Sequence, residues 1–450
     1  MRPLTRFWCG GAMLVMAIAA CNPQSAPTQV AATPPPATGS MSPTVAITAV
    51  PTMPPTVTAT AIPTSTPNPF PDPVLKIVGN AEVVYQWSKD KCEDLDIPDL
   101  PARAFRDAQG NVQLIASHLT VRRAIGPDLD HVKHDCTPVM QSDHIADPSK
   151  YDDNEWLASP YTLDGQTIYA LIHNEYHGHE HSGMCPQHDY FPCWDNSITL
   201  AVSKAGGATY TEAHKPPAQL VARLPYQYKA GDGPDGYRSP SNIIKGPGDY
   251  YYSFFNVSMV KTQKQWVCLM RTNDLTDPTS WRYWNGGSFD GQFIDPYLHP
   301  DAKPEDHLCP PLAMNEIGAS MNESITYNTY LKRYVLVGIS ADQINNRETW
   351  GFFYAFSDDL VHWTHRRLLV EVPLPWTVAN GGTDLSYLYP SLIDPSSASR
   401  NFETAGKTAF VYFTRHNHGQ GNLDRDLIRV PVEFFGSEAQ APQGTSPFKP

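Results

Sequence analysis

The sequence WGFFYAFSDDLVHW, residues 350–363, combines an aromatic-rich strand pattern with a polar turn that ends in tryptophan. Comparable segments occur at residues 196–210, where a strand pattern runs into GGATY, and at residues 265–281, where one runs into NDL and then Trp281. Helical periodicity is scarce throughout the chain. The three segments therefore predict the outer edge of one repeating β unit.

Working outward from these edges, pairs of strands joined by turns recur along the chain. The predicted pairs are 102–106 with 112–117, 161–163 with 167–173, 241–244 with 250–256, 324–328 with 334–339, and 391–393 with 408–415. Five such units predict an all-β fold, a five-bladed β-propeller over residues 73–436. A β-sandwich or jelly roll is the alternative architecture, and the repeat favours the propeller.

The two ends of the propeller are expected to meet in one shared blade. Residues 82–87 would pair beside residues 429–433, which hides sheet edges that would otherwise be open to aggregation.

The N-terminal residues 1–20 have the pattern of a lipoprotein signal peptide. Arg2 and Arg6 precede a short apolar run, and the sequence IAAC, ending at Cys21, fits a bacterial lipobox. We expect Cys21 to carry a lipid; an ordinary cleaved signal with an unrelated cysteine is the alternative. The lipid would be the only membrane anchor of a protein in the bacterial cell envelope, outside the cytoplasm.

The segment after the signal has a composition that cannot build a core. Residues 22–71 contain no charged side chain and are rich in Pro, Thr and Ala. This composition predicts a disordered tether over residues 21–72. A flexible tail is expected at residues 437–450.

The net charge excludes some classes of partner, and the cysteine content indicates the compartment. The formal net charge is −13, and no Lys/Arg cluster opposes it, so nucleic acid and anionic membrane surfaces are not expected partners. An even number of cysteines in an exported chain indicates disulfides. Sequential pairing is the simplest connectivity for the six that follow Cys21: Cys92 with Cys136, Cys185 with Cys193, and Cys268 with Cys309.

Two segments carry a resemblance to a known superfamily. FSDDLVHW at residues 356–363 and SITYN at residues 324–328 resemble the five-bladed propeller glycoside hydrolases, which include arabinanases, β-xylosidases, levansucrases and invertases. The resemblance covers most of residues 75–434 as a blade pattern. Sialidases carry similar blade edges: residues 206–210 are similar to their Asp-box, although Ala205 stands where the Asp would be.

The resemblance implies a site at one end of the central channel, where the innermost strands start. There Asp99 would be the carboxylate base or nucleophile and Glu323 the acid. Asp96 is the substitute if Asp99 is only a turn residue. The third carboxylate of the superfamily would fall near Ser239, but the nearest candidate, Asp235, is displaced by four residues.

Polar side chains at the ends of the predicted inner strands are candidates for sugar contacts. For Arg103, bracing of two blades is the alternative role. The candidates are Arg103, His173, Asn174, Glu175, Arg238, Asn242, Tyr327, Arg415 and His416.

The run HNEYHGHEH at residues 173–181 is open to three interpretations: a sugar-contacting loop, a metal site or a solvated loop. On a strand, His173, Glu175 and His177 share one face, and N/O ligands of this kind bind zinc. A structural zinc site is a further alternative to a disulfide, with ligands Cys185, His188 and Cys193. No resident metal is assigned, and a calcium ion in the channel is left open.

Together these observations predict a monomeric, extracytoplasmic glycoside hydrolase that acts on an oligo- or polysaccharide. A non-catalytic glycan-binding or envelope-scaffolding propeller is the alternative from another class. A metal-dependent hydrolase built on residues 173–181 is the third hypothesis.

Overall fold

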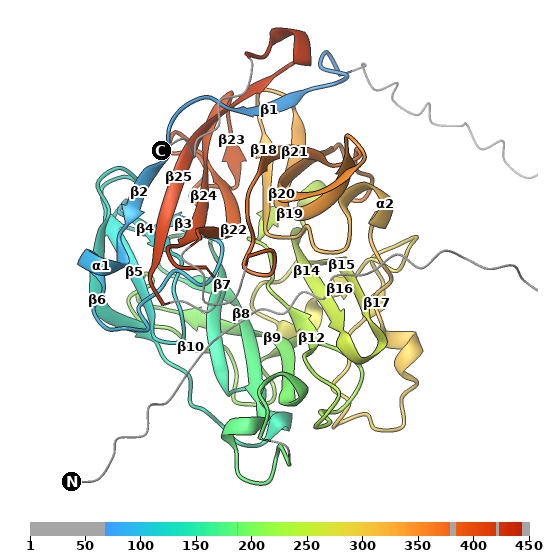
Figure 1. The fold of residues 1–450 in the computed structure, drawn as a ribbon. Coiled ribbons are helices and arrows are strands. Elements are labelled where there is room, and N and C mark those ends of the chain that lie inside the picture. The colour runs from blue at the N-terminus through green and yellow to red at the C-terminus, as the bar shows by residue number, and fades with distance from the viewer. Residues whose placement is uncertain (1–67, 187, 379–383, 420–422, 443–450) are drawn as a thin grey trace, which may run out of the picture. The chain divides into compact units, whose positions relative to one another are not determined.

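The computed structural model describes residues 68–186, 188–378, 384–419 and 423–442. Over these residues the chain is mainly β-sheet, with two one-turn α-helices, α1 (Trp87–Asp90) and α2 (Met314–Ile317) (Figure 1). The predicted all-β class is confirmed. The predicted signal peptide, Cys21 and nearly all of the predicted tether lie outside the described residues.

Strand pairing joins the strands into four mainly antiparallel sheets. The largest, of 11 strands, is divided here at the short parallel pairing of β9 with β12, so that the strands are described as five successive units. The first unit contains β3 (Arg103–Arg106), β4 (Val112–Ile115), β5 (Val121–Gly126) and β6 (Lys133–Met140). The second contains β7 (Asn154–Thr162), β8 (Ile168–His177), β9 (Trp194–Ser203), β10 (Thr211–Glu212) and β11 (Leu220–Arg223). The third contains β12 (Asp235–Arg238), β13 (Ile244–Lys245), β14 (Tyr251–Met259), β15 (Lys264–Thr272), β16 (Arg282–Tyr283) and β17 (Gly291–Gln292).

The last two units complete the order along the chain. The fourth contains β18 (Ser324–Asn328), β19 (Arg333–Ile344), β20 (Arg347–Ser357) and β21 (Arg367–Glu371), with β23 (Thr404–Ala405) beside β18. The fifth contains β22 (Ser386–Ile393), β24 (Thr408–His416) and β25 (Arg425–Phe435), together with β1 (Val74–Ile77) and β2 (Glu82–Tyr85) from the start of the chain.

The two faces of each unit are buried against its two neighbours. In β20, Phe352, Tyr354 and Phe356 pack in one hydrophobic cluster with the fifth unit. The alternate residues, Phe353 and Ala355, pack in another cluster with the third unit. Since successive side chains of a strand point to opposite faces, the aromatic run of β20 fills both interfaces.

Hydrogen bonds between the innermost strands close the units into a ring. The bonds join Arg103 to the Ala158 carbonyl, Ser159 to the Ser241 carbonyl, Ile325 N–H to Asn242, Leu392 N–H to Ser324, and Ser391 to the Ala102 carbonyl. These five bonds link the first unit to the second and so on back to the first. A closed ring of sheets with buried faces is a β-propeller.

The predicted closure between the two ends of the chain is confirmed. Glu82 pairs with Arg429 and Val83 with Ile428, so β2 lies antiparallel to β25. β1 extends the same edge, because Val74 pairs with Phe435.

The third unit begins earlier than the sequence predicts. Its inner strand was expected at residues 241–244, but the longer pairing with β14 is made by β12, and β13 is only two residues long. The break between them falls at Ser239 and Pro240. Ser239 has a φ of 51°, and Pro240 has no N–H to donate, so neither continues a regular ladder.

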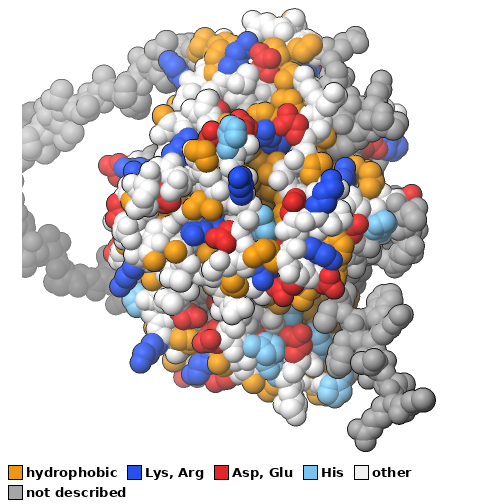
Figure 2. Space-filling model, turned by 90° about the vertical axis from the view of Figure 1, so that its left-hand side faces the viewer, with side chains coloured by type: hydrophobic (Ala, Val, Ile, Leu, Met, Phe, Trp, Pro, Cys, Tyr) orange, Lys and Arg blue, Asp and Glu red, His pale blue; other side chains and the backbone are white. Residues whose placement is uncertain are grey.

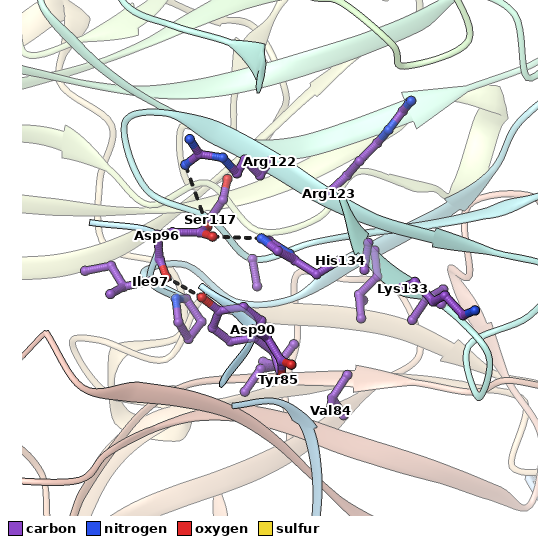
Figure 3. Close-up of a pocket in the computed structure, with 16 residues that line it drawn as sticks. Val84, Tyr85, Asp90, Asp96, Ile97, Ser117, Arg122, Arg123, Lys133 and His134 are labelled. Atoms are coloured by element: carbon purple, nitrogen blue, oxygen red, sulfur yellow. Dashed lines mark hydrogen bonds and ion pairs between the residues drawn. The ribbon is translucent and has the colours of Figure 1, made fainter. Parts of the chain in front are cut away.

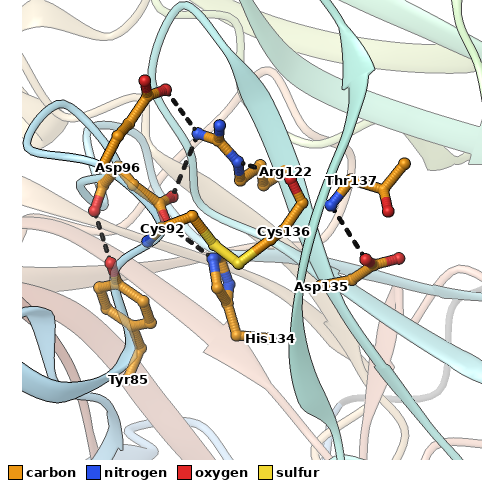
Figure 4. The surroundings of a disulfide bond; sticks show 9 residues. Tyr85, Cys92, Asp96, Arg122, His134, Asp135, Cys136 and Thr137 are labelled. Atoms are coloured by element: carbon orange, nitrogen blue, oxygen red, sulfur yellow. Dashed lines mark hydrogen bonds and ion pairs between the residues drawn. A yellow bond between two sulfur atoms is a disulfide. The ribbon is translucent and has the colours of Figure 1, made fainter.

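The predicted disulfide pairing is confirmed. Cys92 is bonded to Cys136, Cys185 to Cys193, and Cys268 to Cys309. Figure 4 shows the first bridge, which ties the loop after α1 to β6. The bridge between Cys185 and Cys193 excludes the structural zinc site that would use both thiols, because those sulfurs are oxidised.

The surface on the side of β2, α1 and β6 carries interspersed charges. Figure 2 shows Lys and Arg side chains scattered among acidic and neutral ones on this face. Among the described residues there is no helix long and apolar enough to cross a membrane. The first part of the expected tail forms a short 3-10 helix, Glu438–Gln440, and Glu438 makes ion pairs with Lys76 and Arg367.

Candidate functional site

Arg103, which opens β3, binds groups from several units at the centre of the ring. Its guanidinium donates to the carbonyls of Ala158 at 3.1 Å and Glu323 at 2.6 Å, and to the Ser391 hydroxyl at 3.1 Å. Burial lowers the pKa of Arg103 to about 9, so it stays charged at neutral pH. These contacts are those of a brace between blades, the alternative that the sequence left open.

Asp99 lies just before β3 and is held by three side chains. Arg425 of β25 forms an ion pair with it, the Tyr389 hydroxyl of β22 donates to Oδ1 at 3.3 Å, and His118 Nε2 lies 3.5 Å from Oδ2. Asp99 therefore joins the first and fifth units at the end of the ring where the inner strands begin.

Asp96, the substitute for Asp99, has a different environment. It accepts hydrogen bonds from the backbone N–H of Cys92 at 2.9 Å and from His134 Nε2 at 2.8 Å (Figure 4). It lines a cavity of about 360 Å³ between the first and fifth units, beside Tyr85 and Arg122 (Figure 3). A second cavity of about 640 Å³ lies near Trp194 and Tyr228. Neither lining includes Asp99 or Glu323.

Glu175, near the end of β8, is a buried carboxylate between two imidazoles. His173 Nε2 lies 2.7 Å from Oε1, and His177 Nε2 lies 2.9 Å from Oε2. The Nδ1 atom of His173 accepts the backbone N–H of Ser239 at 3.0 Å, so its proton is on Nε2, which donates to Glu175. Burial alone would raise the pKa of Glu175, but the hydrogen bonds from both histidines and the charge of His177 lower it to about 2.

His177 is a cation at neutral pH. Burial lowers its pKa, but its hydrogen bonds to Glu175 and Glu180 outweigh this and raise the pKa to about 9. The His177 imidazolium therefore lies between two carboxylates, Glu175 of β8 and Glu180 of the 3-10 turn that follows it.

Asn174 lies on the opposite face of β8, as strand alternation requires. Its Nδ2 donates to the Ser197 hydroxyl at 2.9 Å, and its Oδ1 accepts the backbone N–H of Asp153 at 3.1 Å. The side chains of His173 and Glu175 therefore meet. The side chain of Asn174 points away from them, toward Ser197 of β9 and the backbone of Asp153.

Glu323, at the head of β18, is held by backbone amides. Its carboxyl oxygens face the N–H groups of Ile339, at 3.1 and 3.2 Å, and Asn322, at 3.1 Å. Burial raises the pKa of Glu323 to about 8 although these amides act in the opposite direction. Gly338 makes room for the carboxyl group, because a Cβ there would lie 2.2 Å from Oε2.

Ser239 links the Glu175 and Glu323 sides of the ring. Its N–H donates to His173, and its carbonyl accepts Asn322 Nδ2 at 2.5 Å. The resemblance placed a third carboxylate near Ser239. In the structure the backbone of Ser239 contacts His173, and His173 in turn donates to the carboxylate of Glu175 in the second unit. Asp235 instead accepts the backbone N–H of Val260 at 2.7 Å.

The remaining candidates have these partners. Arg238 is buried, its Nε donates to Asn256, and the negative charge of Glu175 acts on its guanidinium. Asn242 exchanges two hydrogen bonds with the backbone of Ile325. Tyr327 packs on Tyr334, Arg415 pairs with Asp426 at 2.6 Å, and His416 is buried. Of these residues, Arg238 is the one on which the charge of Glu175 acts, and it belongs with the residues around Glu175 and Asp99.

The sequence missed several members of this group. Tyr389 and Arg425 contact Asp99, and the charges of Asp99 and Glu175 both act on Tyr190 and His118. Tyr389 has a φ of 59° at a break in the register of β22, so no strand pattern indicates where its hydroxyl points.

Side chains that could hold a metal ion form three clusters among the described residues. They are Cys92–Asp96–His134, His144–Asp153–His181 and Asp143–Asp152–Glu212. None includes Asp99, Glu175 or Glu323, and the calcium ion in the channel stays a prediction.

Comparisons with known proteins show similarity in the chain trace only. No family model and no curated protein matches the sequence. An endo-arabinase from Bacteroides thetaiotaomicron superposes with a TM-score of 0.44 at 9% identity, covering 78% of this chain and 97% of its own. The α-L-arabinanase of Cellvibrio cellulosa gives 0.41 at 11%, covering 74% and 91%. A family 117 glycoside hydrolase of Zobellia galactanivorans gives 0.42 at 12%, covering 81% and 93%.

Proposed function

We propose that this protein is an extracytoplasmic glycoside hydrolase that acts on an oligo- or polysaccharide. One observation carries the proposal: Glu323 is buried with a pKa raised to about 8, while Asp99, at the same end of the inner strands, is ion-paired with Arg425. Hydrolysis of a glycosidic bond needs one protonated carboxyl group and one carboxylate on either side of the bond.

Glu323 is proposed as the general acid. With a pKa of about 8 it is mainly protonated at neutral pH, and it can protonate the glycosidic oxygen as the bond breaks. Oε2 accepts N–H bonds from both Asn322 and Ile339, whereas Oε1 faces only Ile339. Oε1 is therefore the oxygen better suited to carry the transferable proton.

Asp99 is proposed as the second carboxyl group. As a carboxylate it either attacks the anomeric carbon or takes a proton from the water that does so. Arg425 and Tyr389 hold its orientation from the fifth unit.

The charged groups between these two residues suit a sugar substrate. The anion of Glu175 favours the positive charge that develops on the sugar ring in the transition state. Arg238 is close enough for its charge to act on Glu175 and is proposed to contact sugar hydroxyl groups.

The location outside the cytoplasm is supported by two independent features. Three disulfides are typical of an oxidising compartment. The lipobox ending at Cys21 supports anchoring through a lipid. Replacing Cys21 with alanine should release the protein from the membrane fraction, and full retention of the variant would contradict the lipid anchor.

The activity is tested with aryl glycosides and oligosaccharides whose leaving groups differ in pKa. We expect the wild-type protein to hydrolyse at least one sugar class. Glu323→Gln should lower kcat by about 10²–10⁴-fold on poor leaving groups and much less on activated ones, because these need no proton. Asp99→Asn should lower kcat on both.

Asp96→Asn serves as the matched control, because Asp96 is a buried carboxylate of the same loop with other partners. Its kcat should match that of the wild type. Full activity of both Glu323→Gln and Asp99→Asn would contradict the proposal. Saturable glycan binding without product would instead favour the non-catalytic glycan-binding propeller.

A further inference from the structure

His144, Asp153 and His181 converge beside the second unit, away from the proposed catalytic pair. His144 lies in the loop before β7, Asp153 immediately precedes β7, and His181 follows the helical turn after β8. His144 Nδ1 is 2.6 Å and His181 Nε2 is 2.9 Å from the same oxygen, Oδ1 of Asp153. One ligand-type atom from each residue lies within 4.8 Å of the other two. We propose that these three side chains form a binding site for a zinc-type divalent cation.

The three donors are a set that zinc prefers. Two imidazole nitrogens and one carboxylate oxygen are borderline ligands, and zinc sites with three protein ligands keep a fourth position for water. Asp153 is 1% exposed, whereas the His144 side chain is 50% exposed. The fourth position therefore lies toward solvent on the His144 side.

Groups that are not ligands already hold Asp153, the His181 ring and the loop of His144 in place. Asp153 Oδ2 accepts the backbone N–H of His177 at 2.7 Å, which leaves Oδ1 for the cation. The His181 ring stacks on Tyr176 with centroids 5.4 Å apart. The Tyr176 hydroxyl donates to the carbonyl of Ala146 at 2.8 Å, which fixes the loop that carries His144. Support of this kind is characteristic of built metal sites.

A second His–Asp pair shows how the cluster of His144, Asp153 and His181 differs from an ordinary ion pair. His131 Nδ1 lies 2.7 Å from Asp128 Oδ1, and within the described part of the chain no second imidazole joins that exposed pair. At Asp153, nitrogen atoms of two imidazoles lie within 2.9 Å of the same carboxylate oxygen. A divalent cation among the three atoms would use a lone pair of each. The zinc–ligand lengths of about 2.0–2.2 Å require the three atoms to separate by less than about 1 Å.

The other clusters do not compete for the same ion. In the first cluster the sulfur of Cys92 is bonded to Cys136 and is not a thiolate ligand (Figure 4). Asp143, Asp152 and Glu212 offer oxygen only, which suits calcium or magnesium rather than zinc. The cation would join the loop before β7 to the loop after β8, and through Asp153 it would hold the backbone of His177.

The test uses the full chain, freed of metal by a chelator and then titrated with Zn²⁺ and, separately, Co²⁺. We expect one bound metal ion per chain by elemental analysis, a higher Tm with zinc, and the visible absorption of four-coordinate cobalt. His144→Ala and His181→Ala should each weaken zinc binding by at least about tenfold. His181 is buried, so His181→Ala could also disturb the fold. His144 is half-exposed, and His144→Ala therefore tests zinc binding with the fold intact.

His131→Ala is the matched control and should bind zinc like the wild type. Zinc binding that is absent, or that is unchanged in the double variant His144→Ala/His181→Ala, would overturn the proposal. Loss of binding in Asp143→Asn alone would place the ion in the oxygen-only cluster instead, and would also overturn it. The readouts are independent of hydrolase activity, so the site and the proposed function can fail separately.

Discussion

The end of β8 and the start of β18 each hold one buried glutamate, and the two glutamates are in opposite protonation states. Glu175 is 6% and Glu323 is 9% exposed, so both lose most of their hydration. Glu175 faces two imidazoles, and its pKa falls to about 2; Glu323 faces backbone amides, and its pKa rises to about 8.

The difference shows which partner decides the charge of a buried carboxyl group. An imidazole can take up a proton and become a counter-charge, whereas a backbone amide offers only a dipole. Burial therefore prevails at Glu323 and is outweighed at Glu175. One blade therefore holds a fixed anion, and another holds a neutral carboxyl group that can donate a proton.

The largest expected effect comes from exchanging each glutamate for glutamine. Glu323→Gln should lower kcat by about 10²–10⁴-fold and leave the free energy of unfolding nearly unchanged, because the group is already neutral. Glu175→Gln should lower the free energy of unfolding by about 3–5 kcal/mol, because it leaves the buried His177 cation without its main partner. Steady-state kinetics measure kcat, and urea unfolding measures the free energy of unfolding of each variant. Equal losses of stability in Glu323→Gln and Glu175→Gln would show that the two glutamates do not differ in charge.

The pH dependence should separate the two residues next. The folded-state pKa of Glu323, about 8, lies above its ordinary value of 4.5, so its contribution to the free energy of unfolding falls as pH rises from 4.5 to 8. For Glu175 the folded-state pKa of about 2 lies below 4.5, so its contribution is complete above 4.5 and is lost as pH falls toward 2. Urea unfolding across pH checks both slopes, and kcat should decline above a pH of about 8 in the wild type. A kcat that stays constant through that range would exclude Glu323 as the acid.

A smaller effect is expected from filling the space that Gly338 leaves. In Gly338→Ala the new Cβ would lie 2.2 Å from Glu323 Oε2, so the carboxyl group must move. Overpacking of this kind costs about 1–3 kcal/mol in stability, and kcat should fall together with it. At Gly287 a Cβ meets nothing closer than 3.9 Å, so Gly287→Ala is the matched control and should change neither quantity. Wild-type kcat in Gly338→Ala would show that the position of the Glu323 carboxyl is unimportant.

The smallest effect on activity is expected at Asp96. Asp96→Asn disturbs the bonds to Cys92 and His134 and should lower the free energy of unfolding by about 1–3 kcal/mol while kcat stays unchanged. Thermal unfolding and steady-state kinetics check the two parts. A large loss of kcat would move the second catalytic carboxyl group from Asp99 to Asp96.

The sequence predicted the features that repeat along the chain. The aromatic run at residues 350–357 predicted a strand, which is β20, but it was expected at the outer edge of a blade and β21 pairs outside it. Residues 82–87 predicted the closing strand beside β25. Both follow from local alternation and from the need to cover sheet edges. The inner strand of the third unit was misplaced because the break at Ser239 depends on a left-handed backbone conformation that residue identity does not reveal.

The site could be predicted only where its residues share a strand. His173 and Glu175 were placed on one face by alternation, which the structure reproduces. Tyr389 and Arg425 meet Asp99 from the far end of the chain, and that contact exists only after the ring has closed. The protonation states could not be predicted either, because they depend on which groups from other blades face each carboxyl.

The most direct test of this account is infrared spectroscopy of the carboxylic acid C=O stretch, comparing the wild type with Glu323→Gln on either side of a pH of about 8. At neutral pH we predict a protonated carboxyl band in the wild type that Glu323→Gln lacks and that disappears as pH rises through the pKa of Glu323. If the two spectra are identical in this region at neutral pH, Glu323 is already ionised and is not the proton donor of this site.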